Sequence, residues 1–296
     1  MLKLVKCGLA GLTARLGGIF CAEKRVIGMV LMERSIRLDP VLLTKTAFNE
    51  FVQQDRVIGT IKFHNVENAK VDRTFTTLTN HKDIPATAGL QKWTATFYKG
   101  GRYQNQLNKL DGSERYAAVF VYEDGTILVK QLKDGTVKGF DVTLYNGLKD
   151  IQIAADAVGA TLMIHLEPYE MKAWQGSAAE YASDDIDFAE MEPIAEVDMV
   201  VPVLSAGATS TVIKITQGGT DAPMIGLDNK LNWKMYRNGV AEGITNLTQV
   251  GENYTFTHAA LVANDSIVFK TEMAGYPIYV LGSGYYVGKS AAKTVV

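Results

Sequence analysis

The sequence predicts an all-β protein made of two β domains, and three observations support this. Apolar and polar residues alternate with a period of two in many short runs, which is typical of strands buried on one face. Asp-Gly and Asn-Gly pairs separate several of these runs, and such pairs form tight β-turns. The chain has 296 residues, 47% of them hydrophobic, which allows one large or two ordinary domains, each with its own core.

Composition excludes several classes of protein. A net charge of −2, from 30 basic and 32 acidic residues, argues against a generally basic nucleic-acid-binding protein and a highly charged disordered chain. Two cysteines, Cys7 and Cys21, are too few for a disulfide scaffold or a four-cysteine zinc site. The longest apolar block, from Val26 to Met32, is too short to span a bilayer. We expect a cytosolic product without a membrane anchor.

Strand alternation dominates the first half of the chain. Trp93, Ala95 and Phe97 fall on one face of a run whose other face is polar. Further strands are expected over residues 60–63, 116–122, 126–132, 137–145 and 161–166. The pairs Asp124-Gly125 and Asp134-Gly135 join three of these runs, so two successive antiparallel hairpins are expected.

One helix is expected among these strands. Tyr103, Leu107 and Leu110 recur at i, i+4 and i+7, and the segment ends near Gly112. Residues 34–54 leave two interpretations open. They form either a long loop or a helix that runs from Asp39 through the sequence VLLTKTAFNEF.

Residues 70–90 do not follow the strand pattern. They combine many threonines with scattered apolar residues and a central proline. Long stretches without regular structure are uncommon in compact domains unless they carry function. We therefore predict an interaction arm that contacts another subunit through Phe75, Leu78, Ile84, Pro85 and Leu90. The alternative is a loop that folds back on its own domain.

Charge divides the chain unevenly. Residues 1–170 carry 22 basic and 18 acidic side chains (22 − 18 = +4), whereas residues 171–296 carry 8 and 14 (8 − 14 = −6). No Lys or Arg occurs from Ala173 to Ile213, where acidic residues lie among small ones. Folding such a stretch would cost conformational entropy, and the stretch buries too little apolar surface to offset that cost. We predict a first domain over 1–172, an acidic linker over 173–198 and a second domain over 199–296, with a solvated helix over 178–191 as the alternative to the linker.

The second domain is also predicted to be β. Its short apolar runs are separated by glycine and asparagine pairs, and Asn238-Gly239 is expected to form a type I′ hairpin turn. About seven short strands of this kind predict an immunoglobulin-like sandwich, here without the usual cysteine pair. The segment after Gly275 is expected to add a strand and then fray.

Few residues follow a catalytic or metal-binding pattern. His165 and Glu167 would point to one face of a strand, but no third ligand lies near them in the sequence. Cys7 and Cys21 lack the spacing of a redox motif and the histidine setting of a nucleophile. We therefore predict no catalytic, cofactor-binding or metal-binding residues, no cofactor and no enzymatic activity.

The order of elements from Leu4 to Pro168 resembles that of bacteriophage tail tube proteins, particularly those of phages that infect Bacteroidetes. The resemblance covers a little over half of the chain and depends on element order more than on invariant motifs. It is carried by the sequence CGLAG from Cys7, Gly17-Gly18-Ile19, the strand LQKWTATF from Leu90, the helix over 103–110, the hairpins at Asp124-Gly125 and Asp134-Gly135, and the closing strand ATLMIHLEP from Ala160.

This resemblance implies a β-sandwich or half-barrel subunit of the virion tail, made in the host cytoplasm. Identical copies would form hexameric rings that stack into a hollow tube for DNA ejection, with other tail proteins as partners and no membrane contact. The arm would reach the next ring, and the immunoglobulin-like domain would decorate the outside. Closing the sheet edges against identical neighbours would also remove an aggregation hazard. Because DNA contact would be passive, the lining should lack dense Lys and Arg.

Two alternatives belong to other functional classes. The chain could be a capsid decoration or head-fibre protein, in which the first domain oligomerises and the second binds the shell or the host surface. It could also be a carbohydrate-binding module with Trp233, Tyr236, Tyr254 and Phe256 as a sugar platform. The alternating placement of these aromatic residues favours the core of the domain over such a platform.

Overall fold

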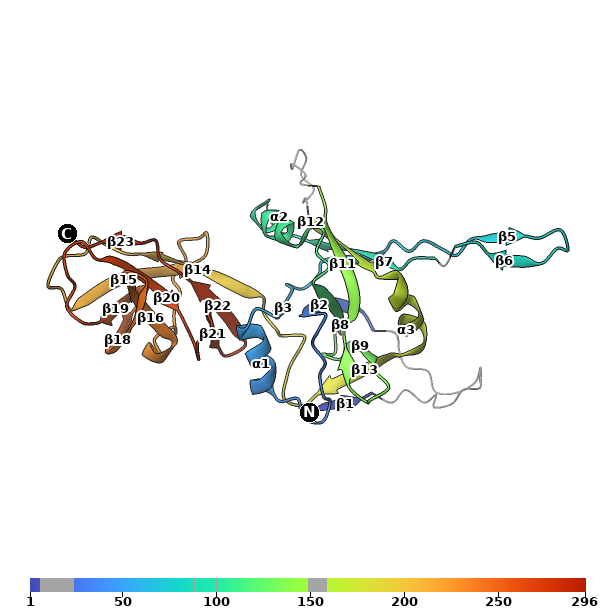
Figure 1. Cartoon of the computed structure of the whole chain (residues 1–296), viewed down its shortest axis with the longest axis horizontal. Helices are drawn as coiled ribbons and strands as arrows, with labels where there is room; N and C mark the ends of the chain where they lie inside the picture. Colours follow the sequence, from blue (N-terminus) through green and yellow to red (C-terminus); the bar gives the residue numbers. More distant parts are fainter. Residues whose placement is uncertain (6–23, 88, 100, 149–158) are drawn as a thin grey trace. The chain divides into compact units, whose positions relative to one another are not determined.

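The computed structural model describes residues 1–5, 24–87, 89–99, 101–148 and 159–296 (Figure 1). Strands account for 47% and helices for 11% of the structure, so the predicted all-β class is confirmed. The chain divides into unit 1, Met1–Lys45 with Gly59–Glu190, and unit 2, Thr46–Ile58 with Met191–Val296. In the described part, no helix is long and apolar enough to cross a membrane.

Unit 1 is organised around one large sheet that curves into a half-barrel. Its strand β8 (Tyr116–Tyr122) pairs with β2 (Val26–Glu33) and β9 (Ile127–Gln131). Strand β11 (Phe140–Asn146) first pairs with β8 and then with β12 (Ala160–Leu166), and so carries the sheet around the bend. The other strands of unit 1 are β1 (Leu2–Leu4), β4 (Asn65–Asn68), β5 (Phe75–Thr77), β6 (Asp83–Pro85), β7 (Lys92–Phe97), β10 (Val137–Lys138) and β13 (Ala178–Ser183). Strand β3 (Val57–Gly59) lies at the unit boundary, with only Gly59 in unit 1.

A short helix, α3 (Met171–Gly176), follows the 3-10 turn η2 (Pro168–Glu170) and packs against the half-barrel. The ring of Trp174 lies 4.9 Å from the rings of Trp93 and Phe140 and 5.8 Å from that of Phe120. These edge-to-face contacts are favourable geometries for aromatic pairs. The sequence analysis did not predict α3, because a six-residue helix is too short to show a helical period.

The helix predicted over 103–110 is present as α2 (Gly101–Leu107) and the 3-10 turn η1 (Asn108–Leu110). A further helix, α1 (Lys45–Gln53), answers the question left open for residues 34–54. It begins at Lys45 and not at Asp39, because Asp39 Oδ1 accepts hydrogen bonds from the backbone N–H groups of Val41 and Leu42 and forms a separate turn.

Most of the strands predicted in unit 1 are present. On β7, Trp93, Ala95 and Phe97 are buried and the residues between them are half-buried. The run over 137–145 is split at Gly139, where a Cβ would lie 3.0 Å from the carbonyl oxygen of Ala118. The strand predicted over 60–63 is wrong, since these residues form an irregular connection between β3 and β4.

The predicted acidic linker over 173–198 is also wrong. Strand β13 pairs with both β1 and β9, and the first strand of unit 2 begins at Ile194, so the units divide at Glu190 and Met191. Tyr181, Ile186 and Phe188 are buried, and the acidic residues between them lie mostly in exposed turns. The alternative helix over 178–191 is excluded because β13 is extended.

Unit 2 is a β-sandwich of two sheets. One sheet contains β18 (Asn246–Val250), β19 (Asn253–Thr257), β15 (Ser210–Gln217), β14 (Ile194–Val200), β22 (Gly284–Gly288) and β21 (Ile278–Leu281), in this order. The other contains β17 (Val240–Gly243), β16 (Trp233–Arg237), β20 (Ser266–Thr271) and β23 (Lys293–Thr294). The unit thus has ten described strands where seven were predicted, and it also includes α1, which the sequence analysis assigned to the first domain.

Aromatic side chains fill the core of unit 2. Trp233, Tyr254 and Phe256 are at most 1% exposed. Trp233 Nε1 donates a hydrogen bond to the backbone oxygen of Leu227 at 2.7 Å, and burial raises the pKa of Tyr254 to about 12. The C-terminal segment does not fray as predicted, because β21, β22 and β23 belong to the two sheets and Val295 is buried.

Candidate assembly surface

The predicted arm is a β-hairpin that extends from the body of unit 1 (Figure 1, β5 and β6). Strand β5 pairs with β6 over three residues on each side. Near the turn, Thr77 Oγ1 donates a hydrogen bond to Asp83 Oδ1 at 2.5 Å, and His81 adopts a φ of 58°. A contact of 2.9 Å between the hydroxyl groups of Thr74 and Thr87 lies where the hairpin meets the rest of the arm. The arm therefore has regular structure, which the sequence analysis did not predict.

The apolar residues of this hairpin face solvent. Phe75 is 60%, Leu78 41% and Ile84 40% exposed, and Pro85 is exposed beside Phe75. This exposure argues against the alternative in which the segment folds back on its own domain. Leu90 differs from the other predicted contact residues, because it is half-buried at the base of the arm and exchanges two 2.8 Å backbone hydrogen bonds with Val71.

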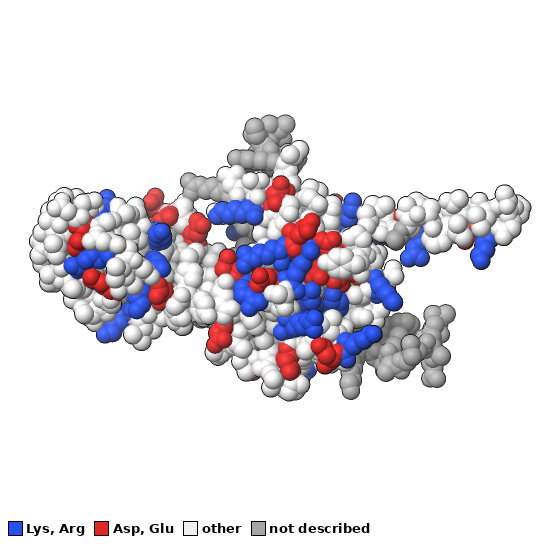
Figure 2. Space-filling model, viewed as in Figure 1, with Lys and Arg blue, Asp and Glu red and all other residues white. Residues whose placement is uncertain are grey.

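The surface of the hairpin carries few charges. Figure 2 shows it largely white, whereas Lys, Arg, Asp and Glu gather side by side over the body of unit 1. A two-stranded hairpin is at best marginally stable in water, and exposed apolar side chains add nothing to its stability until they are covered. The hairpin thus has the properties of a segment that gains stability by packing on another surface.

A hollow of about 410 Å³ lies at the base of the arm, where the arm meets α3. It is lined by residues 70–73 and 89–91 of the arm and by Met171 and Gln175 of α3. Gly89 has a φ of +71°, and a Cβ there would lie 3.0 Å from the carbonyl oxygen of Val71. Glycine at this position therefore allows the two strands of the base to lie close together beside α3.

The second feature is the sheet edge at β4. This strand pairs with β7, and no other described strand pairs with it. Ala69 N–H donates to the carbonyl oxygen of Lys92, and hydrogen bonding alternates along an antiparallel pair. The backbone groups of Val66 and Asn68 therefore point away from β7, toward the open edge.

The solvent-facing side of β11, β12, β7 and β4 is poor in charge. Its cross-strand rows join Thr143 with His165 and Lys92, then Tyr145 with Met163, Thr94 and Glu67, and then Thr161 with Thr96 and Asn65. Burial, and then the nearby Lys92, lower the pKa of His165, so its ring is neutral at pH 7. This face thus has one cation and one anion in these rows.

His165 and Glu167, the two residues considered together in the sequence, do not share a site. Glu167 Oε1 lies 2.5 Å from Arg34 and accepts a hydrogen bond from Thr143 Oγ1 at 2.7 Å, so it does not form a site with His165. The described residues contain no group of three His, Cys, Asp or Glu that could hold a metal ion. Cys7 and Cys21, with the glycine motifs around them, lie outside the described residues.

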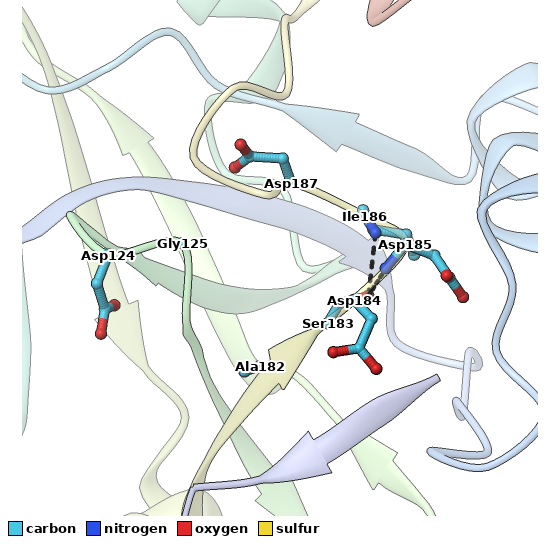
Figure 3. A pocket seen from close by; sticks show the side chains of 8 residues that line it. All are labelled: Asp124, Gly125, Ala182, Ser183, Asp184, Asp185, Ile186 and Asp187. Atoms are coloured by element: carbon cyan, nitrogen blue, oxygen red, sulfur yellow. Dashed lines mark hydrogen bonds between the residues drawn. The ribbon is translucent and has the colours of Figure 1, made fainter.

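An acidic hollow of about 320 Å³ lies beside the turn between β8 and β9 (Figure 3). The four aspartates drawn there point in different directions and do not converge on one point. Lys24 lies 2.8 Å from Asp124, and Lys3 lies 2.6 Å from Asp184. Although burial opposes it, hydrogen bonds from Lys24 and Thr126 lower the pKa of Asp124 to about 2. The hollow is therefore a set of local ion pairs and turn contacts.

Sequence analysis missed the open edge at β4 and two buried carboxylates of unit 1, Asp141 and Glu170. Asn65–Asn68 shows no clear alternation, and a buried carboxylate has no signature in a single sequence.

Comparisons of the chain with protein-family models, curated proteins and solved structures give no match.

Proposed function

We propose that this protein is a structural subunit of a bacteriophage tail tube that assembles with identical copies into stacked rings around a DNA conduit. The observation that carries the proposal is the projecting hairpin with Phe75, Leu78 and Ile84 exposed at its surface. Apolar side chains held away from the core of their own unit favour burial against another molecule. In this proposal, the hairpin packs on a subunit of the adjacent ring.

The open edge of β4 supports lateral assembly in the same proposal. A strand with unpaired backbone groups pairs readily with a strand of another chain. Identical copies that close a ring in this way leave no free edge. In the proposed ring, the half-barrel of each subunit contributes one section of a continuous wall through β4.

The charge-poor face of β11, β12, β7 and β4 would line the conduit. Cations that neutralise phosphates hold DNA, so a face with one cation and one anion in its rows lets the polyanion slide. Contact with DNA would thus be passive. The tail of the virion is the proposed location of the protein.

Replacing two apolar residues of the hairpin tests the role of the arm. We expect Phe75→Ser with Ile84→Ser to abolish stacking into tubes while single rings still form, because the apolar contact between rings is lost. Electron microscopy and light scattering of the purified chain would measure this. Leu42→Ser is the control, because it removes an exposed apolar residue outside the arm, 72% exposed. Tubes of normal length from the double variant contradict the role of the arm.

A proline at the open edge separates ring closure from stacking. We expect Val66→Pro to leave unit 1 folded but to prevent ring formation, because proline removes the N–H that points away from β7. Glu67→Pro is the matched comparison, since the N–H of Glu67 faces β7 and its loss should weaken unit 1 itself. Circular dichroism would report folding, and electron microscopy would report rings. Rings formed by a folded Val66→Pro variant would exclude β4 as the lateral contact.

The same microscopy distinguishes the other functional classes. Stacked rings support a tail tube, whereas isolated trimers support a decoration or head-fibre protein. For a carbohydrate-binding module, the main aromatic residues are unsuitable, because Trp233, Tyr254 and Phe256 lie in the core of unit 2. The fourth residue of the suggested sugar platform, Tyr236, is half-buried, and Lys270 Nζ lies 4.2 Å from the centre of its ring.

A further inference from the structure

Unit 1 contains a buried group of charged side chains that tube assembly does not require. Lys130 from β9, Lys138 from β10, Asp141 from β11 and Glu170 from η2 meet in one place. Asp141 is 6% and Glu170 2% exposed. Lys130 forms an ion pair with Glu170 Oε1, and Lys138 Nζ lies 2.7 Å from Asp141 Oδ1.

The two carboxyl groups belong to one cluster, because their partners Lys130 and Lys138 lie opposite each other on β9 and β10. Glu170 Oε2 is buried, and no described residue donates a hydrogen bond to it. Asp141 lies within hydrogen-bonding reach of Glu170. Two ionised carboxylates only accept hydrogen bonds, so this contact is repulsive unless one of them carries a proton. Burial, and then the negative charge of Asp141, raise the pKa of Glu170, although Lys130 opposes this effect.

We propose that Asp141 and Glu170 share one proton and that this proton fixes η2 and α3 on the half-barrel. The shared proton turns the contact between two acceptors into a hydrogen bond from Glu170 Oε2 to Asp141. The groups that face this pair are Lys130, Lys138 and Tyr169, whose hydroxyl donates to Asp141 Oδ2 at 3.3 Å. The ion pair of Arg34 with Glu167 is the next charged neighbour.

The position of Glu170 connects this proton to the arm. Glu170 directly precedes α3, whose Trp174 packs against the aromatic core of the half-barrel. Met171 and Gln175 of the same helix line the hollow at the base of the hairpin. Loss of the proton would therefore loosen α3 and, with it, the support of the arm. The inference concerns the folded chain alone and does not depend on the proposed tail tube function.

The sign of the pH dependence follows from the direction of the shift. Because the pKa of Glu170 is higher in the folded than in the unfolded chain, the folded state binds the extra proton between these two values. The stabilisation is complete below the unfolded pKa and is lost as the pH rises through the folded pKa. Over that window, the unfolding equilibrium constant should rise up to about tenfold per pH unit from this one proton.

Glu170→Gln tests the shared proton in the full chain. Glutamine keeps the shape of the side chain and can donate to Asp141, but it has no proton to lose in this range. As the pH rises from the usual pKa of glutamate, hydrogen exchange of residues 168–176, corrected for its intrinsic pH dependence, should show falling protection in the wild type and constant protection in the variant. Glu190→Gln is the control, because Glu190 forms an exposed pair with Lys62 at 2.8 Å and should keep the wild-type slope. Equal slopes in the wild type and Glu170→Gln would overturn the proposal.

A measurement on the wild-type chain covers the case in which Glu170→Gln does not fold. With ¹³C in the side-chain carboxyls of Asp and Glu, one resonance should titrate above the usual value for glutamate. Burial alone should keep the midpoint of Glu170 raised, and we expect Asp141→Asn to move it partly downward, because that variant removes the neighbouring negative charge. A spectrum in which every carboxyl titrates at or below its usual value would overturn the proposal.

Discussion

Phe256→Ala should destabilise unit 2 by about 3–5 kcal/mol, which is the usual cost of deleting a fully buried aromatic side chain. Phe256 is fully buried, and its ring lies 5.2 Å from the rings of both Trp233 and Phe269. The substitution removes these contacts and leaves a cavity between the two sheets, because a close-packed core relaxes only partly. Hydrogen exchange of peptides from β15 and β19 would measure the effect as a loss of protection.

The control for this prediction lies in the same sheet. Val250 is 79% exposed, so Val250→Ala should change protection little. If Phe256→Ala leaves the protection of β15 and β19 at the wild-type level, the aromatic cluster is not the core of unit 2. Trp233, Tyr254 and Phe256 would then be available to bind a sugar, as the carbohydrate-binding alternative requires.

Trp174→Ala should destabilise unit 1 by about 3 kcal/mol, near the lower end of the range for aromatic deletions, since Trp174 is only half-buried. The substitution removes three ring contacts, to Trp93, Phe120 and Phe140. It should also free α3 from the half-barrel. Hydrogen exchange of residues 168–176, 93–97 and 116–122 would show the loss.

Lys172→Ala is the matched control, because Lys172 lies in the same helix with its side chain exposed. It should keep α3 in place and leave the protection of β7 and β8 unchanged. Unchanged protection in Trp174→Ala would mean that α3 is not part of the core of unit 1.

Local sequence patterns were reliable for tight turns and strand alternation, which depend on neighbouring residues. The pairs Asp124-Gly125 and Asp134-Gly135 form the two predicted turns, with positive φ at both glycines and hydrogen bonds from Thr126 and Thr136 to the aspartates. Asn238 and Gly239 both have positive φ, as a type I′ turn requires. Alternation along β7 also predicted which of its side chains are buried.

Composition alone misled where buried residues were few and widely spaced. The segment 173–198 contains many acidic residues, yet Tyr181, Ile186 and Phe188 are buried and fix it to unit 1. Helix α1 belongs to unit 2, where Tyr285 donates a hydrogen bond to Asn49 Oδ1 at 2.7 Å across 236 positions. Contacts between residues so distant in sequence leave no trace in a single sequence.

For the candidate assembly surface, too, the sequence predicted some features and only the structure showed the others. Departure from strand alternation identified the arm and four of its exposed residues, Phe75, Leu78, Ile84 and Pro85, but the sequence did not predict that the arm is a paired hairpin. Leu90, also predicted as a contact residue, belongs to the base. The edge at β4 and the contact of Asp141 with Glu170 could not be predicted, because each depends on which elements the fold places next to one another.

The sequence by itself determined the β class, the tight turns, the positions of most strands and the presence of an unusual segment at 70–90. These properties depend on neighbouring residues and on the period of two that a pleated strand imposes. Only the tertiary structure decided where the units divide, which sheet edge stays open, that α3 packs on the half-barrel and that two carboxyl groups meet in its interior. These properties depend on long-range packing, which a single sequence does not encode in any local pattern.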